Sequence, residues 1–225
     1  MKKYIKLIAI VFVCSLVLVG VNARNTKAAS EEIINRFSLS QGWNLMYGLQ
    51  DPMQIISASD AYVSPPTVEE IRSDIELIYV YDSNAKKYVL LYAKRGTLES
   101  GEYKNFNPPT SIAEDIPTSV MWVFSEKTHS IKYRVASPPP LSQRKISAGW
   151  NFIPVFSDIQ GKSINEIKGS CSIDALYTYA EDDGITQWIN LKNIYDFNDK
   201  RALTEAPILG LQLVIKVTNN CQMGI

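Results

Sequence analysis

The chain begins with a basic segment followed by a long apolar run. Three lysines among the first six residues precede an almost unbroken apolar stretch over residues 7–21, which ends in Val21-Asn22-Ala23. This order of charge, apolar run and small residue is typical of a secretory signal peptide, and we expect cleavage after Ala23. The alternative is a retained membrane anchor, but spanning a bilayer takes about 20 apolar residues, and this run is shorter.

Strand-like apolar segments then recur in the same order in two halves of the chain. Residues 75–82 and 173–180 are rich in β-branched and aromatic side chains, and a polar turn follows each of them. Such segments favour β-hairpins, and Asp183-Gly184 is a hairpin signal in the second half. The other matching pairs are 40–46 with 147–153, 88–92 with 187–191, and 120–124 with 211–215.

Each half also carries one capping box, the sequence signature of a helix start. Thr67 is followed three residues later by Glu70, and Ser163 is followed by Glu166. In this motif the hydroxyl accepts a hydrogen bond from the third backbone N–H, and the carboxylate reaches back to the first. The sequence therefore predicts a mainly β, β-rich α+β fold: two tandem copies of a small sheet or sandwich unit, each with one short helix.

The domain boundaries follow from this repetition. We expect a signal peptide at residues 1–23, a first β module at 24–135, a proline-rich linker at 136–144 and a second β module at 145–225. Three successive prolines, Pro138 to Pro140, favour an extended spacer. The first module also has two long polar insertions, 51–66 and 96–117, and Tyr62, Tyr103 and Phe106 are candidate partner-binding side chains within them.

The openings Gly42-Trp43-Asn44-Leu45-Met46 and Gly149-Trp150-Asn151-Phe152-Ile153 carry a family resemblance. Together with Tyr79-Val80-Tyr81-Asp82 before a hairpin and a closing apolar strand, they resemble the GWNLI-type β modules repeated in bacterial and archaeal secreted and cell-surface proteins. The resemblance covers both modules, and the closing strands keep part of that family's pattern. It implies an extracellular accessory or adhesive module and supplies no catalytic residue.

Charge and cysteine content narrow the classes of partner. Removal of residues 1–23 takes away three lysines and no acidic residue, so the formal net charge falls from 0 to −3. A mildly acidic, mixed surface lacks the basic patch that nucleic acids require, and we expect no nucleic acid partner and, after signal cleavage, no membrane. Cys171 and Cys221 then form an even pair, which predicts a disulfide in an oxidising compartment, with two free thiols as the alternative.

Aromatic residues are the best candidates for ligand binding. Tyr79 and Tyr81, like Tyr177 and Tyr179, project to one face of their strand because strand side chains alternate. Exposed, these tyrosines could hold a sugar ring, but the opposite faces are apolar too, so alternation leaves the core face open. We expect Trp43 and Trp150 in the core, with a ligand platform as the alternative.

Candidate catalytic chemistry is sparse. His129, the only histidine, falls in a polar segment that predicts a solvated turn, and no nucleophile, phosphate-loop or zinc motif is present. The acidic segments 181–183 and 196–199 match no calcium loop. We expect no catalytic residue, no metal and no cofactor.

Three functions remain open on the sequence. The leading prediction is a non-enzymatic exported interaction or adhesion module, whose partner is an unknown protein or a cell-surface glycan. The first alternative is a carbohydrate-binding module that uses a row of exposed aromatic residues, drawn from Tyr79, Tyr81, Tyr88, Tyr92 and their counterparts in the second half. The second is a secreted hydrolase, which requires a cleft with converging acidic groups.

Overall fold

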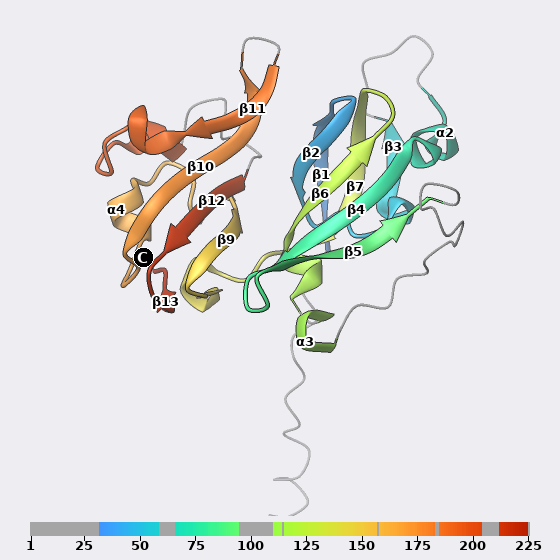
Figure 1. Ribbon diagram of the computed structural model, residues 1–225. Coiled ribbons are helices and arrows are strands. Elements are labelled where there is room, and N and C mark those ends of the chain that lie inside the picture. Colours follow the sequence, from blue (N-terminus) through green and yellow to red (C-terminus); the bar gives the residue numbers. More distant parts are fainter. Residues whose placement is uncertain are drawn as a thin grey trace, which may run out of the picture. The chain divides into compact units, whose positions relative to one another are not determined.

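Figure 1 shows the computed structural model, which describes residues 32–58, 66–94, 110–113, 115–156, 158–182, 185–203 and 212–224. The expected signal peptide lies outside these residues. The fold is mainly β, as the sequence predicts, and residues 32–225 form a single compact unit. None of the helices in the described part is long and apolar enough to cross a membrane.

The first module consists of seven strands and two short α-helices in the described ranges. Its strands are β1 (Glu32–Leu39), β2 (Gly42–Tyr47), β3 (Ile55–Ala58), β4 (Ile75–Asp82), β5 (Lys87–Ala93), β6 (Val120–Ser125) and β7 (His129–Ala136). Its helices are α2 (Val68–Ser73) and α3 (Thr110–Ala113), with 3₁₀ turns at Pro52–Gln54 and Ile116–Thr118.

The second module is smaller. Its strands are β8 (Lys145–Ile146), β9 (Gly149–Pro154), β10 (Ile173–Asp182), β11 (Ile185–Asn190), β12 (Gln212–Val217) and β13 (Cys221–Gln222). It contains helix α4 (Ile164–Ile167) and 3₁₀ turns at Leu141–Gln143, Leu191–Asn193 and Lys200–Leu203.

The two modules contain four-stranded antiparallel sheets with the same strand order. The first runs β2-β6-β4-β5 and the second runs β9-β12-β10-β11, so each strand of one has a counterpart in the other. The hairpin register is also shared, because Tyr81 is opposite Tyr88 and Tyr179 is opposite Trp188.

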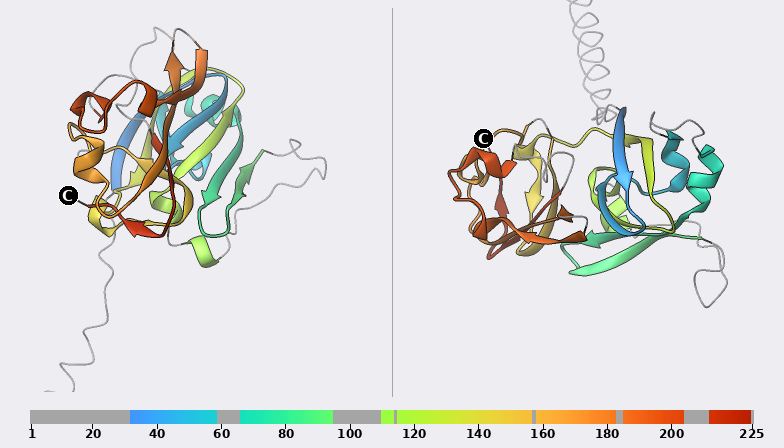
Figure 2. Two further views of the ribbon diagram at one scale, coloured as in Figure 1. Left: turned by 60° about the vertical axis from the view of Figure 1, so that its left-hand side comes forward. Right: turned by 90° about the horizontal axis from the view of Figure 1, so that it is seen from above.

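The modules differ in what covers the inner face of this sheet. In the first, the three-stranded sheet β1-β7-β3 packs against it (Figure 2), and the core includes Tyr47, Ile78, Met121 and Tyr133. In the second, helix α4, the 3₁₀ turns and the two-stranded ribbon β8-β13 supply the covering residues, among them Leu141 and Ile164. Apolar burial on one face of each sheet therefore stabilises both modules.

The Gly-Trp-Asn motif forms the same turn in both modules. Gly42 and Gly149 have φ values of +97° and +104°, a left-handed region that glycine adopts without a Cβ clash. The Asn44 side chain accepts a hydrogen bond from the Ser40 N–H (2.8 Å) and donates to the Ser40 and Gly42 carbonyls. Asn151 makes the same three bonds one module later. These side-chain bonds fix the entry of β2 and β9.

Both predicted capping boxes are confirmed. The Thr67 hydroxyl accepts from the Glu70 N–H, the Ser163 hydroxyl accepts from the Glu166 N–H, and both glutamates accept from the backbone N–H of their cap. The predicted disulfide is confirmed as well: Cys171 and Cys221 are bonded, with Cα atoms 5.1 Å apart. It ties the residues after α4 to β13.

The proline-rich segment is more tightly packed than a free spacer. Leu141 is buried in the second core, and the Arg144 guanidinium donates to the carbonyls of Pro139 and Pro154 and to the Asp158 carboxylate. The segment between the modules is therefore anchored to the second one.

Two sequence predictions about the first module are wrong. His129 is the first residue of β7, only 7 % exposed, and its Nε2 lies 2.8 Å from the Asp74 carboxylate, which Lys127 also contacts. It is a buried structural residue because β7 pairs with both β1 and β3. The insertion 51–66 is also no simple loop, since residues 51–58 form a capped 3₁₀ turn and strand β3.

Candidate ligand-binding surface

Aromatic side chains cover the outer faces of the two four-stranded sheets. Strand alternation sends Ile78 and Val80 of β4 into the first core and Tyr79 and Tyr81 to the other side. In β10, Leu176 likewise points inward, while Tyr177 and Tyr179 point outward. The tyrosine face is therefore the one opposite the module core, which settles the choice that the sequence left open.

The same alternation overturns the predicted position of two tryptophans. Trp43 is 39 % exposed and Trp150 is 37 % exposed, so neither lies in a core. The reason is the asparagine that follows each of them: its side chain turns inward to hold the Gly-Trp-Asn turn, and the preceding residue must then face outward.

The outer faces of the two sheets meet over part of their area. Leu45 and Val120 of the first sheet and Val214 of the second are buried together, and Phe152 packs against this cluster. Strand β2 contacts β12 and strand β6 contacts β9, which are equivalent pairs when the modules are exchanged. The contact is thus approximately self-complementary, as in an isologous dimer.

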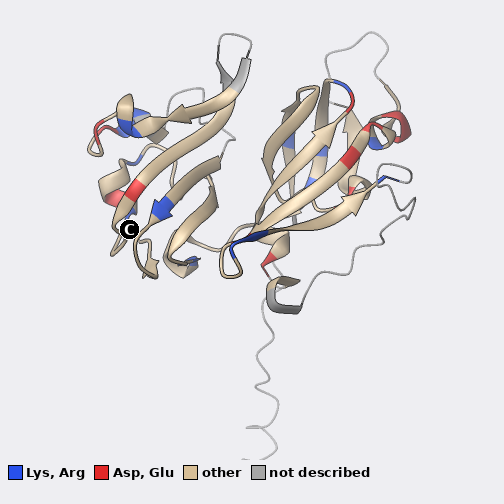
Figure 3. Cartoon of the chain, in the orientation of Figure 1, with Lys and Arg blue, Asp and Glu red and all other residues tan. Residues whose placement is uncertain are grey.

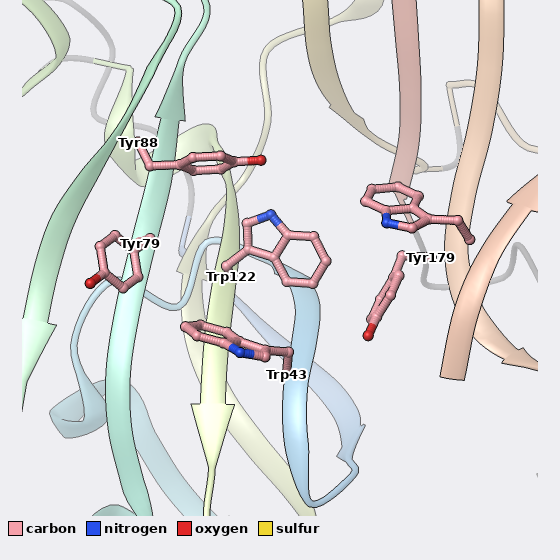
Figure 4. A pocket seen from close by; sticks show the side chains of 6 residues that line it. Trp43, Tyr79, Tyr88, Trp122 and Tyr179 are labelled. Atoms are coloured by element: carbon pink, nitrogen blue, oxygen red, sulfur yellow. The ribbon is translucent and has the colours of Figure 1, made fainter. Parts of the chain in front are cut away.

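Beside this cluster, aromatic rings surround an open hollow of about 460 Å³ (Figure 4). Figure 4 shows the labelled rings gathered around a common space, with Tyr179 coming from the second sheet. Tyr88 and Trp188 are about half exposed (52 % and 46 %), so the hollow is accessible from solvent. The residues that line it are Trp43, Tyr79, Tyr88, Trp122, Tyr179 and Trp188.

Ring contacts extend the lining of the hollow into a continuous strip. The centroids of Trp43 and Trp122 are 6.3 Å apart, and Trp122 contacts Tyr179 at 4.8 Å. Tyr179 contacts Trp188 at 5.2 Å, Trp188 contacts Tyr177 at 6.4 Å, and Tyr177 contacts Trp150 at 6.1 Å. We call this path, Trp43, Trp122, Tyr179, Trp188, Tyr177 and Trp150, the aromatic strip. It contains all four tryptophans of the chain.

Three of the strands that contribute to the strip lack charged residues. Strands β2, β6 and β9 contain no Lys, Arg, Asp or Glu (Figure 3), and the residues that line the hollow are all aromatic. Burial raises the pKa of the Tyr179 hydroxyl, so it stays protonated at neutral pH. Lys216 lies opposite Trp150 in the β9-β12 register, at the far end of the strip.

Polar groups in the hollow are available to a ligand. Within the described part of the chain, the hydroxyls of Tyr79, Tyr88 and Tyr179 and the indole N–H groups of Trp43 and Trp188 make no hydrogen bond to protein. Tyrosine and tryptophan thus present an apolar ring and a free polar atom side by side, which suits ligands with both kinds of surface.

The predicted tyrosines fall into two groups on this surface. Tyr79 and Tyr179 line the hollow, while Tyr177 continues the strip toward Trp150. Tyr81 instead packs between Tyr88 and Phe152, with centroid distances of 5.1 and 5.3 Å. The sequence predictions left out Trp122 and placed Trp43 and Trp150 in the core, whereas Tyr88 was among the aromatic candidates of the carbohydrate-binding alternative. Trp188 lies opposite Tyr179 as Tyr88 lies opposite Tyr81, so it is the counterpart of Tyr88 in the second module.

The predicted partner-binding side chains Tyr62, Tyr103 and Phe106 lie outside the described residues, and so does most of the insertion 96–117. In its described part, residues 110–113 form α3 and Ile116 is buried. The three candidate side chains therefore stay a prediction.

The other ionisable groups that could take part in chemistry lie outside the hollow and stabilise the fold. Burial and a hydrogen bond with Glu126 raise the pKa of Glu76, beside Lys94. Asp196 and Asp199 cap a turn, and Asp199 also pairs with Arg201. Among the described residues, no group of three or more His, Cys, Asp or Glu is placed to hold a metal ion.

No protein-family model matches the chain, and comparisons with curated proteins and with solved structures find no match. Function is therefore argued from the surface itself.

Proposed function

We propose that the protein is an exported, non-enzymatic interaction module that binds a carbohydrate in the aromatic hollow. The observation that carries the proposal is the hollow between the two sheets, which six aromatic side chains line; among the described residues, no charged side chain lines it. A cell-surface or extracellular glycan is the partner class that this chemistry fits best.

The chemistry of a pyranose ring matches that lining. Its axial and equatorial hydrogens form apolar faces that stack on indole and phenol rings, and its hydroxyls bond to polar atoms around the edge. Clefts that recognise small ligands commonly combine such an apolar wall with a few polar groups. The unpaired hydroxyl of Tyr88 and the indole N–H of Trp188 are groups of this kind, half exposed at the rim.

The absence of charge in the hollow argues against rival ligands. A phosphate or carboxylate requires Lys, Arg or a helix N-terminus, and none lines the hollow among the described residues. A bound cation would be attracted to the ring faces, but no carboxylate in the described part of the chain lines the hollow to reinforce that attraction. A neutral ligand with apolar faces is left as the best fit.

The export part of the proposal rests on two features. The Cys171–Cys221 disulfide fits an oxidising compartment, and the first residues have the pattern of a signal peptide. Glycans on a cell surface or in the extracellular matrix would be encountered in that location.

The test is a titration with a panel of neutral oligosaccharides: cello-, xylo-, manno- and chito-oligosaccharides. Tryptophan fluorescence is a direct readout, because every tryptophan lies on the strip. We expect saturable binding of at least one series. In Trp188→Ala we expect a loss of affinity of about tenfold or more, equivalent to ~1.4 kcal/mol or more.

Ile194→Ala is the matched control, since Ile194 is a large apolar residue, 57 % exposed, outside the strip. It should bind like the wild type. The proposal fails if the folded protein binds no member of the panel, or if both variants lose affinity equally. Binding of proline-rich peptides alone would also overturn it, because aromatic grooves can recognise such peptides.

A further inference from the structure

We infer that the aromatic strip is one extended site for a linear oligosaccharide, with Trp150 and Tyr177 forming a distal subsite beyond the hollow. The inference rests on the proposed function and specifies its ligand as a chain of several sugar units. It rests first on two pairs of aromatic rings that have the same geometry.

The distal pair reproduces the arrangement of a pair in the hollow. Trp43 and Tyr79 have ring centroids 6.1 Å apart and an interplanar angle of 53°. Trp150 and Tyr177 have the same separation, 6.1 Å, and an angle of 55°. The identity follows from shared strand order, because β2 and β9 are equivalent, as are β4 and β10. Two like subsites on one surface suit a ligand built from repeating units.

Trp188 connects the two pairs. Its ring contacts Trp122 at 5.8 Å and Tyr179 at 5.2 Å on the side of the hollow, and Tyr177 at 6.4 Å on the distal side. With 46 % of its surface exposed, it presents a ring to solvent midway between them. A chain that leaves the hollow can therefore stay in contact with aromatic rings until it reaches Trp150.

The two ends of the strip differ in the number of aromatic rings beside their tryptophan. This difference predicts which end binds sugar units more tightly. In the first sheet, Trp122 and Phe124 stand beside Trp43 and add walls to the hollow. In the second, the corresponding residues are Val214 and Lys216, which add no aromatic wall beside Trp150. The hollow should bind the first sugar units, and the distal subsite should add affinity only for longer chains.

The experiment measures dissociation constants for a ladder from disaccharide to hexasaccharide of whichever series the protein binds. We expect affinity to rise along the ladder in the wild type. In Trp150→Ala the disaccharide should bind within about twofold of the wild type, and the hexasaccharide should bind about tenfold more weakly, ~1.4 kcal/mol by conversion. Trp43→Ala should weaken both ligands.

Trp150→Phe guards against a folding artefact, because it keeps an aromatic ring next to the Asn151 turn and should retain most of the affinity for the long chain. Hydrogen exchange in β9 should be unchanged in both variants. Equal losses for short and long ligands in Trp150→Ala, or no loss for either, would overturn the inference. A wild type whose affinity is independent of chain length would overturn it too while leaving the proposed function standing. Failure to bind any glycan is the separate result that removes the proposed function itself.

Discussion

The two modules share one sheet and stabilise it by different means. The first buries its inner face under a second sheet, β1-β7-β3, and its core unites residues from both layers. The second has only a two-stranded ribbon, short helical turns and a disulfide in the equivalent place. The smaller module, with less apolar area to bury, is the one with the covalent crosslink, as expected for small domains.

The outer faces differ in a second way. Both begin with an exposed tryptophan and carry two tyrosines on the central strand, but the closing strand supplies Trp122 and Phe124 in the first module and Val214 and Lys216 in the second. The frame is repeated while the residues that deepen the hollow are not. Aromatic side chains and stabilising elements are thus distributed unequally over two modules with one strand order.

The largest expected effect is a loss of stability in the second module alone when its disulfide is removed. In the double variant Cys171→Ser/Cys221→Ser, we expect the second module to lose about 4 kcal/mol, the chain-entropy value for closing a loop of this length; the sequence separation is 50 residues. Hydrogen exchange should then accelerate in β10 and β12 and stay slow in β4 and β6. Chemical denaturation of oxidised and reduced wild type measures the same difference.

Equally accelerated hydrogen exchange in both modules would contradict this expectation. It would show that the contact through Leu45, Val120 and Val214 makes the two modules unfold as one. The control is reduction of the double variant, which should change nothing further because no other cysteine follows residue 23.

The second prediction tests what the modules share. Asn44 and Asn151 are both about 95 % buried and make the same three hydrogen bonds. Replacing either with alanine leaves backbone groups of the turn without partners, and we expect a loss of about 2–3 kcal/mol in each case. Asn219→Ala, at an exposed position, is the control. Unequal losses of unfolding free energy, measured by denaturation, would show that the turn contributes differently to the stability of each module.

Sequence patterns were sufficient for the elements that local chemistry specifies. The capping boxes, the hairpins and the cysteine pair each depend on a few neighbouring residues or on a simple count, and all are found where expected.

The pattern could not show which face of the sheet is buried. In β4 both Ile78 with Val80 and Tyr79 with Tyr81 are apolar enough for a core, and the choice depends on a covering sheet from distant segments. That sheet was missed because β3 lies in a segment interpreted as a polar loop and β7 begins at a histidine interpreted as a turn. Trp43 and Trp150 were misplaced for the same reason. Large aromatic residues are usually buried, and no neighbouring residue shows that the outer sheet faces that carry these tryptophans are partly exposed to solvent.

The smallest expected effect distinguishes the two helix starts. Thr67→Ala and Ser163→Ala each remove a cap that typically contributes about 1 kcal/mol. Thr67 is exposed, so water can replace its hydroxyl, whereas Ser163 is only 4 % exposed and leaves the Glu166 N–H poorly solvated. We therefore expect the larger loss in the second module, measured by denaturation at neutral pH. Equal losses would mean that burial of the cap has no bearing on its contribution.

The same caps predict a dependence on pH. Hydrogen bonds from the Ser163 backbone N–H, then from Lys200 and the Ser163 hydroxyl, lower the pKa of Glu166 to about 2. Because the folded pKa is below the unfolded value of about 4.3, this contribution to stability is complete above the unfolded pKa and is lost as pH falls toward 2. Glu166→Gln keeps an acceptor in the capping box but cannot titrate, so its unfolding free energy should vary less with pH between about 4.3 and 2 than that of the wild type. An identical slope in both proteins would assign the acid sensitivity to other carboxylates, of which Asp74, held by His129 and Lys127 in the first module, is the first to test.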